Sequence, residues 1–286
     1  MFAEELIIGH RHSCRRGSPL KSWSMPIARL ILAPAILITA TFSPLNEHGQ
    51  PGRAAFTLLQ DNPKAERDFA KLIAQISSSD VEARLDAVLQ LSSLGDPRAV
   101  SALKSACNDG SQLVRAAAVT GLARFGDLEN APTVVALLST DKSAFVRKMA
   151  AYALGILKTP SALAALKVAL QDKDSEVRGA AAVSLGKYRD PSTMTPLIAS
   201  LKDRSSFVRE QASRALGLIG ESARPAVPAL IGLLEGDDDP AVHREAATAL
   251  GSIGDRSAIP ALERASQLPD PHLSRAAIEA IKELTK

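Results

Sequence analysis

Apolar residues recur in blocks of about thirty along most of the chain. In each block, an apolar residue is followed by alanine or a similar small residue four positions later and by leucine or isoleucine eight positions later, as in Val146, Ala150 and Leu154. Residues four apart lie on one face of a helix, so each block predicts an amphipathic helix with one buried face. The first apolar position of the stripe, called the anchor below, falls at Ala83, Val114, Val146, Val177, Val208, Val242 and Leu273.

Each anchor helix has a start signal and a partner. Three positions before the anchors stand residues that commonly cap a helix N-terminus, namely Asp80, Ser111, Ser143, Asp174, Ser205, Asp239 and Asp270. A second apolar segment, such as "SALAALKVAL", precedes these caps, and in five units it begins after Asp96, Asn130, Thr159, Asp190 or Asp255. Each unit therefore predicts two antiparallel helices.

The spacing of the units predicts the architecture. Successive anchors are 31 to 34 residues apart, and a fixed period of this size is typical of solenoids, in which each unit packs only on its neighbours. Alanine and leucine supply most apolar positions and aromatic residues are only 3%, which favours helices over strands. We expect an all-α fold, an α-solenoid of about seven antiparallel helix hairpins with a period of about 31 residues, over residues 64–286.

The amino terminus has the features of an export signal. Basic residues precede the apolar run "LILAPAILITATF", which at 13 residues with Pro34 inside it is short for a membrane span. We expect a leader over residues 1–43, with Met25 as an alternative translation start, and a flexible linker over residues 44–63. Cleavage would place the protein in the periplasm, in the cell envelope or outside the cell. An uncleaved leader that anchors the chain in the membrane is the alternative.

The distribution of charge argues against nucleic-acid binding. The net charge is +3, and residues 1–55 contain six basic and three acidic residues. The rest of the chain holds 28 basic and 28 acidic residues, so its net charge is zero. Proteins that bind nucleic-acid phosphates normally carry a positive surplus, so we expect no nucleic-acid partner.

The repeated motif resembles a known family. The segments "SAFVRKMAAYALG", ending at Gly155, and "SSFVREQASRALG", ending at Gly217, follow the pattern "VRxxAAxALG" after an apolar helix. This pattern is similar to the HEAT-repeat family, in the short form of the phycobilisome-lyase-like (PBS lyase) HEAT-like repeats. The resemblance implies a curved right-handed array, with the second helix of each unit on the concave side. It also implies a scaffold that binds proteins, although a minority of members are tied to enzymes.

Four units carry the same charged pair. An aspartate precedes an arginine by six residues at Asp109 and Arg115, Asp141 and Arg147, Asp172 and Arg178, and Asp203 and Arg209. A catalytic pair would be special to one unit, whereas repetition indicates a structural role. The resemblance implies that these residues form a ladder of hydrogen bonds between neighbouring units. The first and seventh units lack the pair, and in the sixth Asp237 is followed by His243.

Candidate partner-binding residues lie on the second helices, at positions expected to point away from the partner helix. Val119, Tyr152 and Val183 predict an apolar strip over the second, third and fourth units. Arg214 and Arg244 begin a stretch of mixed charge in the later units. The alternative is that the apolar residues only pack one unit against the next. The binding hypothesis requires them to be exposed in one continuous strip.

The sequence offers no catalytic, cofactor or metal site. Cys107 is the only cysteine after the leader and has no histidine near it in sequence, which favours an inert buried thiol. The related iron-binding HEAT enzymes, the deoxyhypusine hydroxylases, depend on His-Glu pairs, and the dipeptide "HE" does not occur here. We therefore expect no enzyme activity, no cofactor and no metal.

Three functions are compatible with these features. The preferred one is a non-enzymatic, exported scaffold that binds a protein or peptide on its concave face and touches a membrane only through an uncleaved leader. The first alternative is a phycobilin lyase or isomerase-like subunit, which the short repeat suggests. The second is a HEAT-like DNA glycosylase, which the neutral body disfavours because such an enzyme needs a basic cleft.

Overall fold

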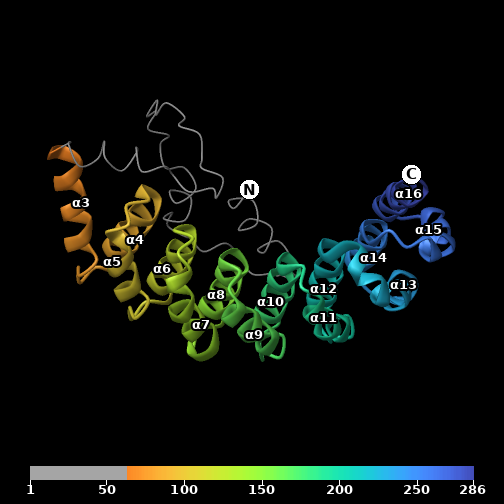
Figure 1. The fold of residues 1–286 in the computed structure, drawn as a ribbon, viewed down its shortest axis with the longest axis horizontal. Coiled ribbons are helices and arrows are strands. Elements are labelled where there is room, and N and C mark those ends of the chain that lie inside the picture. The colour runs from red at the N-terminus through yellow and green to blue at the C-terminus, as the bar shows by residue number, and fades with distance from the viewer. Residues whose placement is uncertain (1–62) are drawn as a thin grey trace, which may run out of the picture. The chain divides into compact units, whose positions relative to one another are not determined.

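A computed structural model describes residues 63–286, and the regular elements in this range are all helical. The helices pair into seven hairpins that follow one another in a curved row, with the second helices on its concave side (Figure 1). The all-α solenoid predicted from the period is therefore confirmed. The predicted leader, and the predicted linker except for its last residue, lie outside the described residues.

The helices have the bounds expected from the repeat. The first helices are α3 (Pro63–Gln75), α5 (Ala99–Ala106), α7 (Ala131–Thr140), α9 (Pro160–Ala169), α11 (Met194–Ser200), α13 (Val227–Gly236) and α15 (Ile259–Ser266). The second helices are α4 (Val81–Leu94), α6 (Gln112–Arg124), α8 (Ala144–Leu157), α10 (Ser175–Tyr188), α12 (Ser206–Ile219), α14 (Pro240–Ile253) and α16 (Pro271–Thr285). None of the helices in this range is long and apolar enough to span a bilayer.

The core is built from the repeated stripe. Leucine eight residues after the anchor is fully buried in six units, at Leu91, Leu122, Leu154, Leu185, Leu216 and Leu250. Each second helix packs on its own first helix and on the adjacent second helices, of which α4 and α16 have one each. Apolar burial is the main favourable term in folding, so stability comes from these repeated contacts between neighbours rather than from one central core.

Glycine sets the spacing between consecutive second helices. A Cβ atom added to Gly186 of α10 would lie 2.6 Å from the Cα atom of Ala215 in α12. One added to Gly251 of α14 would lie 2.8 Å from the Cα atom of Ala280 in α16. Both distances are too short for non-bonded carbon atoms. The glycine nine positions after the anchor therefore lets the next second helix approach closely, which explains the "ALG" of the motif.

The structure revises two details of the predicted helix starts. The caps Asp80, Asp174, Asp239 and Asp270 accept hydrogen bonds from backbone N–H groups, whereas the three serine caps do not. Asn130 lies at the N-cap position of α7, but its side chain accepts no capping hydrogen bond, and Asp127 caps the short turn before α7. Asn130 is fully buried, and both polar atoms of its side chain lack a hydrogen-bond partner.

Candidate protein-binding surface

Buried arginine–aspartate pairs join neighbouring hairpins. Arg115 at the start of α6 donates from Nε and Nη2 to both carboxylate oxygens of Asp141, over 2.7 and 2.9 Å. Its Nη1 donates to the carbonyl oxygen of Asp109 in its own unit over 2.8 Å. A planar guanidinium suits this arrangement because it can bond a carboxylate with two parallel N–H groups and still reach a carbonyl.

The same geometry recurs at five places in residues 63–286. We call this set the ladder, and its pairs are Arg84 with Asp109, Arg115 with Asp141, Arg147 with Asp172, Arg178 with Asp203, and Arg209 with Asp237. Each arginine pairs with the aspartate of the following unit, and from the second unit on the aspartate of its own unit pairs with the arginine of the unit before. Sequence reasoning missed Arg84 and Asp237, because it looked for both members within one unit.

Each ladder aspartate also orders the turn before its second helix. Oδ1 of Asp109 accepts a hydrogen bond from the backbone N–H of Ser111 over 2.8 Å, and Asp141 binds Ser143 in the same way. Burial alone would raise the pKa of Asp141. The hydrogen bonds from Arg115 and from the Ser143 N–H outweigh that effect and lower the pKa below its usual range.

The predicted apolar strip is wrong in two of its three residues. Val119 is fully buried and Val183 is only 7% exposed, whereas Tyr152 is half-buried. The physical reason is the close approach that the glycines permit, since α10 is flanked by α8 and α12 at short distance. Val119 and Val183 therefore pack between units, as the alternative interpretation held, and a partner cannot reach them without opening the fold.

The third unit presents its accessible side chains on α8. Tyr152 is half-buried there, one turn after Lys148. The Lys148 Nζ donates to Glu176 of α10 over 2.7 Å and lies 5.5 Å from the centre of the Phe145 ring. These side chains combine aromatic surface with a charge that is held in place, which suits contact with another polypeptide.

The later units present charge on the same side. Arg214 of α12 lies between Glu210 and Glu245, with its Nη2 3.1 Å from the nearer oxygen of Glu245 in α14. Burial raises the pKa of Glu210, although the positive charge of Arg214 opposes that shift. Arg244 of α14 contacts Asp270 at 3.4 Å. Arg214 and Arg244 thus lie partly exposed on successive second helices, 42% and 38% by side chain.

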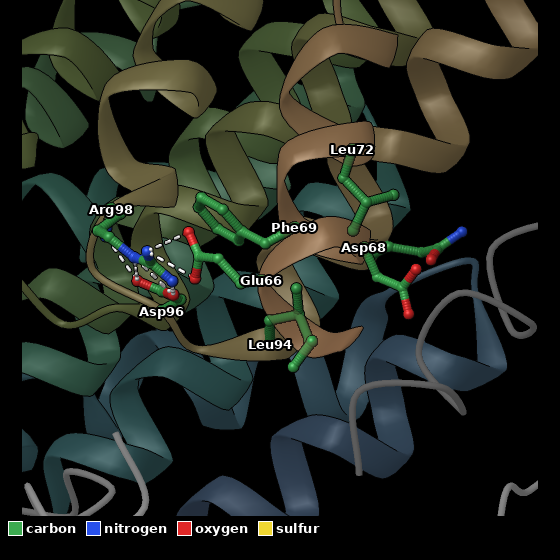
Figure 2. A pocket seen from close by; sticks show the side chains of 9 residues that line it. Glu66, Asp68, Phe69, Leu72, Leu94, Asp96 and Arg98 are labelled. Atoms are coloured by element: carbon green, nitrogen blue, oxygen red, sulfur yellow. Dashed lines mark hydrogen bonds and ion pairs between the residues drawn. The ribbon is translucent and has the colours of Figure 1, made fainter. Parts of the chain in front are cut away.

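A pocket lies at the other end of the array, between α3, α4 and the start of α5. Figure 2 shows Phe69 and Leu72 along one wall, and Arg98 bonded to both Glu66 and Asp96. The pocket encloses about 230 Å³, below the roughly 300–1,000 Å³ of ordinary ligand sites. Its small volume is the reason that this pocket is not the candidate site.

Reactive groups are sparse in the described part of the chain. Burial raises the pKa of the Cys107 thiol to about 12, so the sulfur stays protonated at neutral pH. Among residues 63–286, no cluster of three or more histidine, cysteine, aspartate and glutamate side chains could hold a metal ion.

Comparison with protein families gives one consistent result. The model of HEAT repeats matches residues 101–185, 164–236 and 227–286, which together make up more than half of the chain. The model of the PBS lyase HEAT-like repeat matches residues 83–109. None of the curated proteins compared with this chain matches it in sequence.

Solved structures share the fold at low sequence identity. YibA from Escherichia coli is 19% identical, with a TM-score of 0.53, over 86% of this chain and 98% of its own. An engineered protein is 22% identical, with a TM-score of 0.51, over 78% of this chain and 70% of its own. The CpcE–CpcF complex of phycocyanin lyase from a Nostoc species contains a chain that is 24% identical, with a TM-score of 0.49, over 74% of this chain and 85% of that one.

Proposed function

This chain belongs to the HEAT-repeat family, and on that premise we propose that it is a non-enzymatic scaffold that binds a protein or an extended peptide. The binding surface is the concave side of the solenoid, where the second helices face a common space (Figure 1). We define the proposed surface by Lys148, Tyr152, Arg214 and Arg244. It requires no cofactor, no metal and no nucleic acid.

One observation carries this proposal: charged residues that recur from unit to unit and charged residues that do not recur lie in different places. The repeated arginines and aspartates are largely buried in the ladder, where each holds a structural hydrogen bond. The charges that differ from unit to unit, such as Lys148, Arg214 and Arg244, are partly exposed on the second helices. Exposed positions that differ between units are not required by the repeat structure, so their side chains can suit a particular partner.

The surface has the composition of an interaction site of moderate polarity. Tyrosine and arginine are enriched at protein interfaces because they combine apolar area with hydrogen-bonding groups. Arg214 donates two N–H groups to Glu245 of the neighbouring helix, so part of its conformational freedom is already lost before binding. A partner would contact a pre-formed surface rather than one that it has to assemble.

The test compares two variants of the full chain as bait in extracts of the cell envelope. Tyr152→Ala combined with Arg214→Ala alters the proposed surface, while Val168→Ser alters an exposed side chain of α9 on the first-helix side. We expect a partner that is retained by the unaltered chain and by Val168→Ser but lost with the double variant. A partner lost with Val168→Ser and retained by the double variant would contradict the proposal.

Export belongs to the same proposal and rests on the basic and then apolar leader, which lies outside the described residues. A protein-binding scaffold in the periplasm, the envelope or the medium would lose this leader on secretion. Amino-terminal sequencing of the protein recovered from cells decides the point. We expect a mature chain that begins after the apolar run, and intact cytosolic chains that begin at Met1 or Met25 would refute export.

A further inference from the structure

The ladder stops before the last hairpin. Its arginine lies one position after the anchor, and its aspartate lies five positions before the anchor of the next unit. In the sixth unit the arginine position is His243, and in the seventh the aspartate position is Leu268. Both members of the pair are therefore replaced at one joint, between α14 and α16, while the five preceding joints keep both.

The replacement removes two kinds of hydrogen bond from this joint and leaves one buried ring atom without a partner. A leucine side chain cannot accept the paired N–H groups that a ladder arginine would donate across the joint. It also leaves the backbone N–H of Asp270 without the carboxylate that binds the matching N–H of Asp239 in the preceding unit. Finally, the ring atom Nε2 of His243 is buried without a partner.

The contacts that remain across this joint differ in kind from the ladder. Arg244 reaches one oxygen of Asp270 at 3.4 Å, and Arg264 of α15 contacts Glu235 of α13. All four side chains are about a third exposed or more, and exposed ion pairs contribute little because water and salt screen them. Apolar packing persists, since Gly251 lies against Ala280. The last hairpin is thus docked by packing but lacks the buried bidentate bond of the other joints.

We propose that the seventh hairpin, α15 and α16, opens from α14 as a unit while the first six hairpins stay together. Repeat arrays open at the interface with the smallest stabilising contribution, because each unit is held only by its neighbours. Opening would expose the α14 face and change the length of the concave surface. The missing ladder pair at His243 and Leu268 is the reason that the opening occurs at this joint.

Hydrogen exchange of the full chain, measured by mass spectrometry, tests the proposal when the unaltered chain is compared with a variant that restores the missing ladder pair. The variant His243→Arg with Leu268→Asp restores both members of the pair. Since Leu268 is 47% exposed, the aspartate replaces no core side chain. We expect the repair to slow exchange in α15 and α16 by about tenfold while exchange in α4 is unchanged. Because the two residues act as a pair, each single substitution should slow exchange much less than both together.

A second variant removes the ladder pair at another joint. Arg178→His with Asp203→Leu reproduces the natural replacement at the joint between α10 and α12, and exchange should accelerate in the helices on both sides of that joint. Unchanged exchange in α15 and α16 after the repair would overturn the proposal, since ordinary fraying of a chain end does not depend on the ladder. Equal slowing in α4 and α16 would overturn it as well, because the effect would then be general.

Discussion

Arginine has two different tasks in this protein, and its place in the unit decides which one. One position after the anchor, Arg147 is only 5% exposed and bonds Asp172 across a joint. Six positions after the anchor, Arg214 is half-exposed on the concave side. The first joins two neighbouring units, and the second lies on the surface that we propose for recognition. Position in the repeat is therefore a better guide to function than residue type.

Val183 provides a test of the corrected surface. Glutamate at this buried position would place an unpaired carboxylate between helices, so we expect the free energy of unfolding to fall by about 3–5 kcal/mol. Thr248→Glu is the matched control, because Thr248 occupies the same position of the sixth unit and is exposed. Its midpoint in urea should stay close to that of the unaltered chain. Equal midpoints for the two variants would show that Val183 is accessible to solvent.

We predict that the free energy of unfolding is lower with Asn130 than with alanine at the same position. Its buried amide has no hydrogen-bond partner, while the equivalent positions of three other units hold the buried alanines Ala99, Ala162 and Ala258. Replacing Asn130 by alanine removes the unpaired polar group, and we expect the free energy of unfolding to rise by about 1 kcal/mol. Urea unfolding measures the change. A clear loss of stability would mean that the amide does have a partner.

At the scale of the helix, the close approach of α10 and α12 predicts that a side chain at Gly186 lowers stability. Gly186→Ala would push a methyl group against the backbone of Ala215, and we expect a loss of about 1–3 kcal/mol from overpacking. Gly232→Ala in α13 is the control, because a Cβ atom there meets nothing within 4 Å. The higher helix propensity of alanine should make that variant slightly more stable. Identical effects of both substitutions would disprove the spacing role.

The helices were predictable from the sequence, and their accessible faces were not. Seven anchors with seven caps fix the second helices, because a helix start and an apolar stripe are local signals. Whether Val183 faces water depends on how closely α8, α10 and α12 pack, and that distance is set by glycines on one helix and small residues on the next. The pairing of Arg84 with Asp109 was hidden because it joins two residues that are 25 positions apart and lie in different units.

At the scale of the whole molecule, the ladder makes stability depend on acid pH. The pKa values of Asp109, Asp141, Asp172, Asp203 and Asp237 are all lowered in the folded chain. A lowered carboxyl pKa stabilises the fold above the unfolded value of about 3.9, and that contribution is lost as the pH falls through the folded value. Glu210, whose pKa is raised by burial, contributes with the opposite sign.

We therefore expect the urea midpoint to fall steadily as the pH is lowered from about 5 to about 2. In this range the five aspartates bind protons more readily in the unfolded chain than in the folded chain, so acid favours unfolding. The variant Asp172→Asn has one titrating group fewer and should show a shallower dependence. Midpoints that are constant over this range would contradict the ladder as an electrostatic element.

We propose that this HEAT-repeat solenoid binds a polypeptide with the concave side of its second helices. Photo-crosslinking in cells measures this directly, with a benzophenone amino acid placed in the full chain at Tyr152 or Arg214 and, as the control, at Val168 on α9. The account predicts one discrete crosslinked polypeptide from Tyr152 and Arg214 and none from Val168. Discrete crosslinks from Val168 alone would contradict it and would assign binding to the first helices.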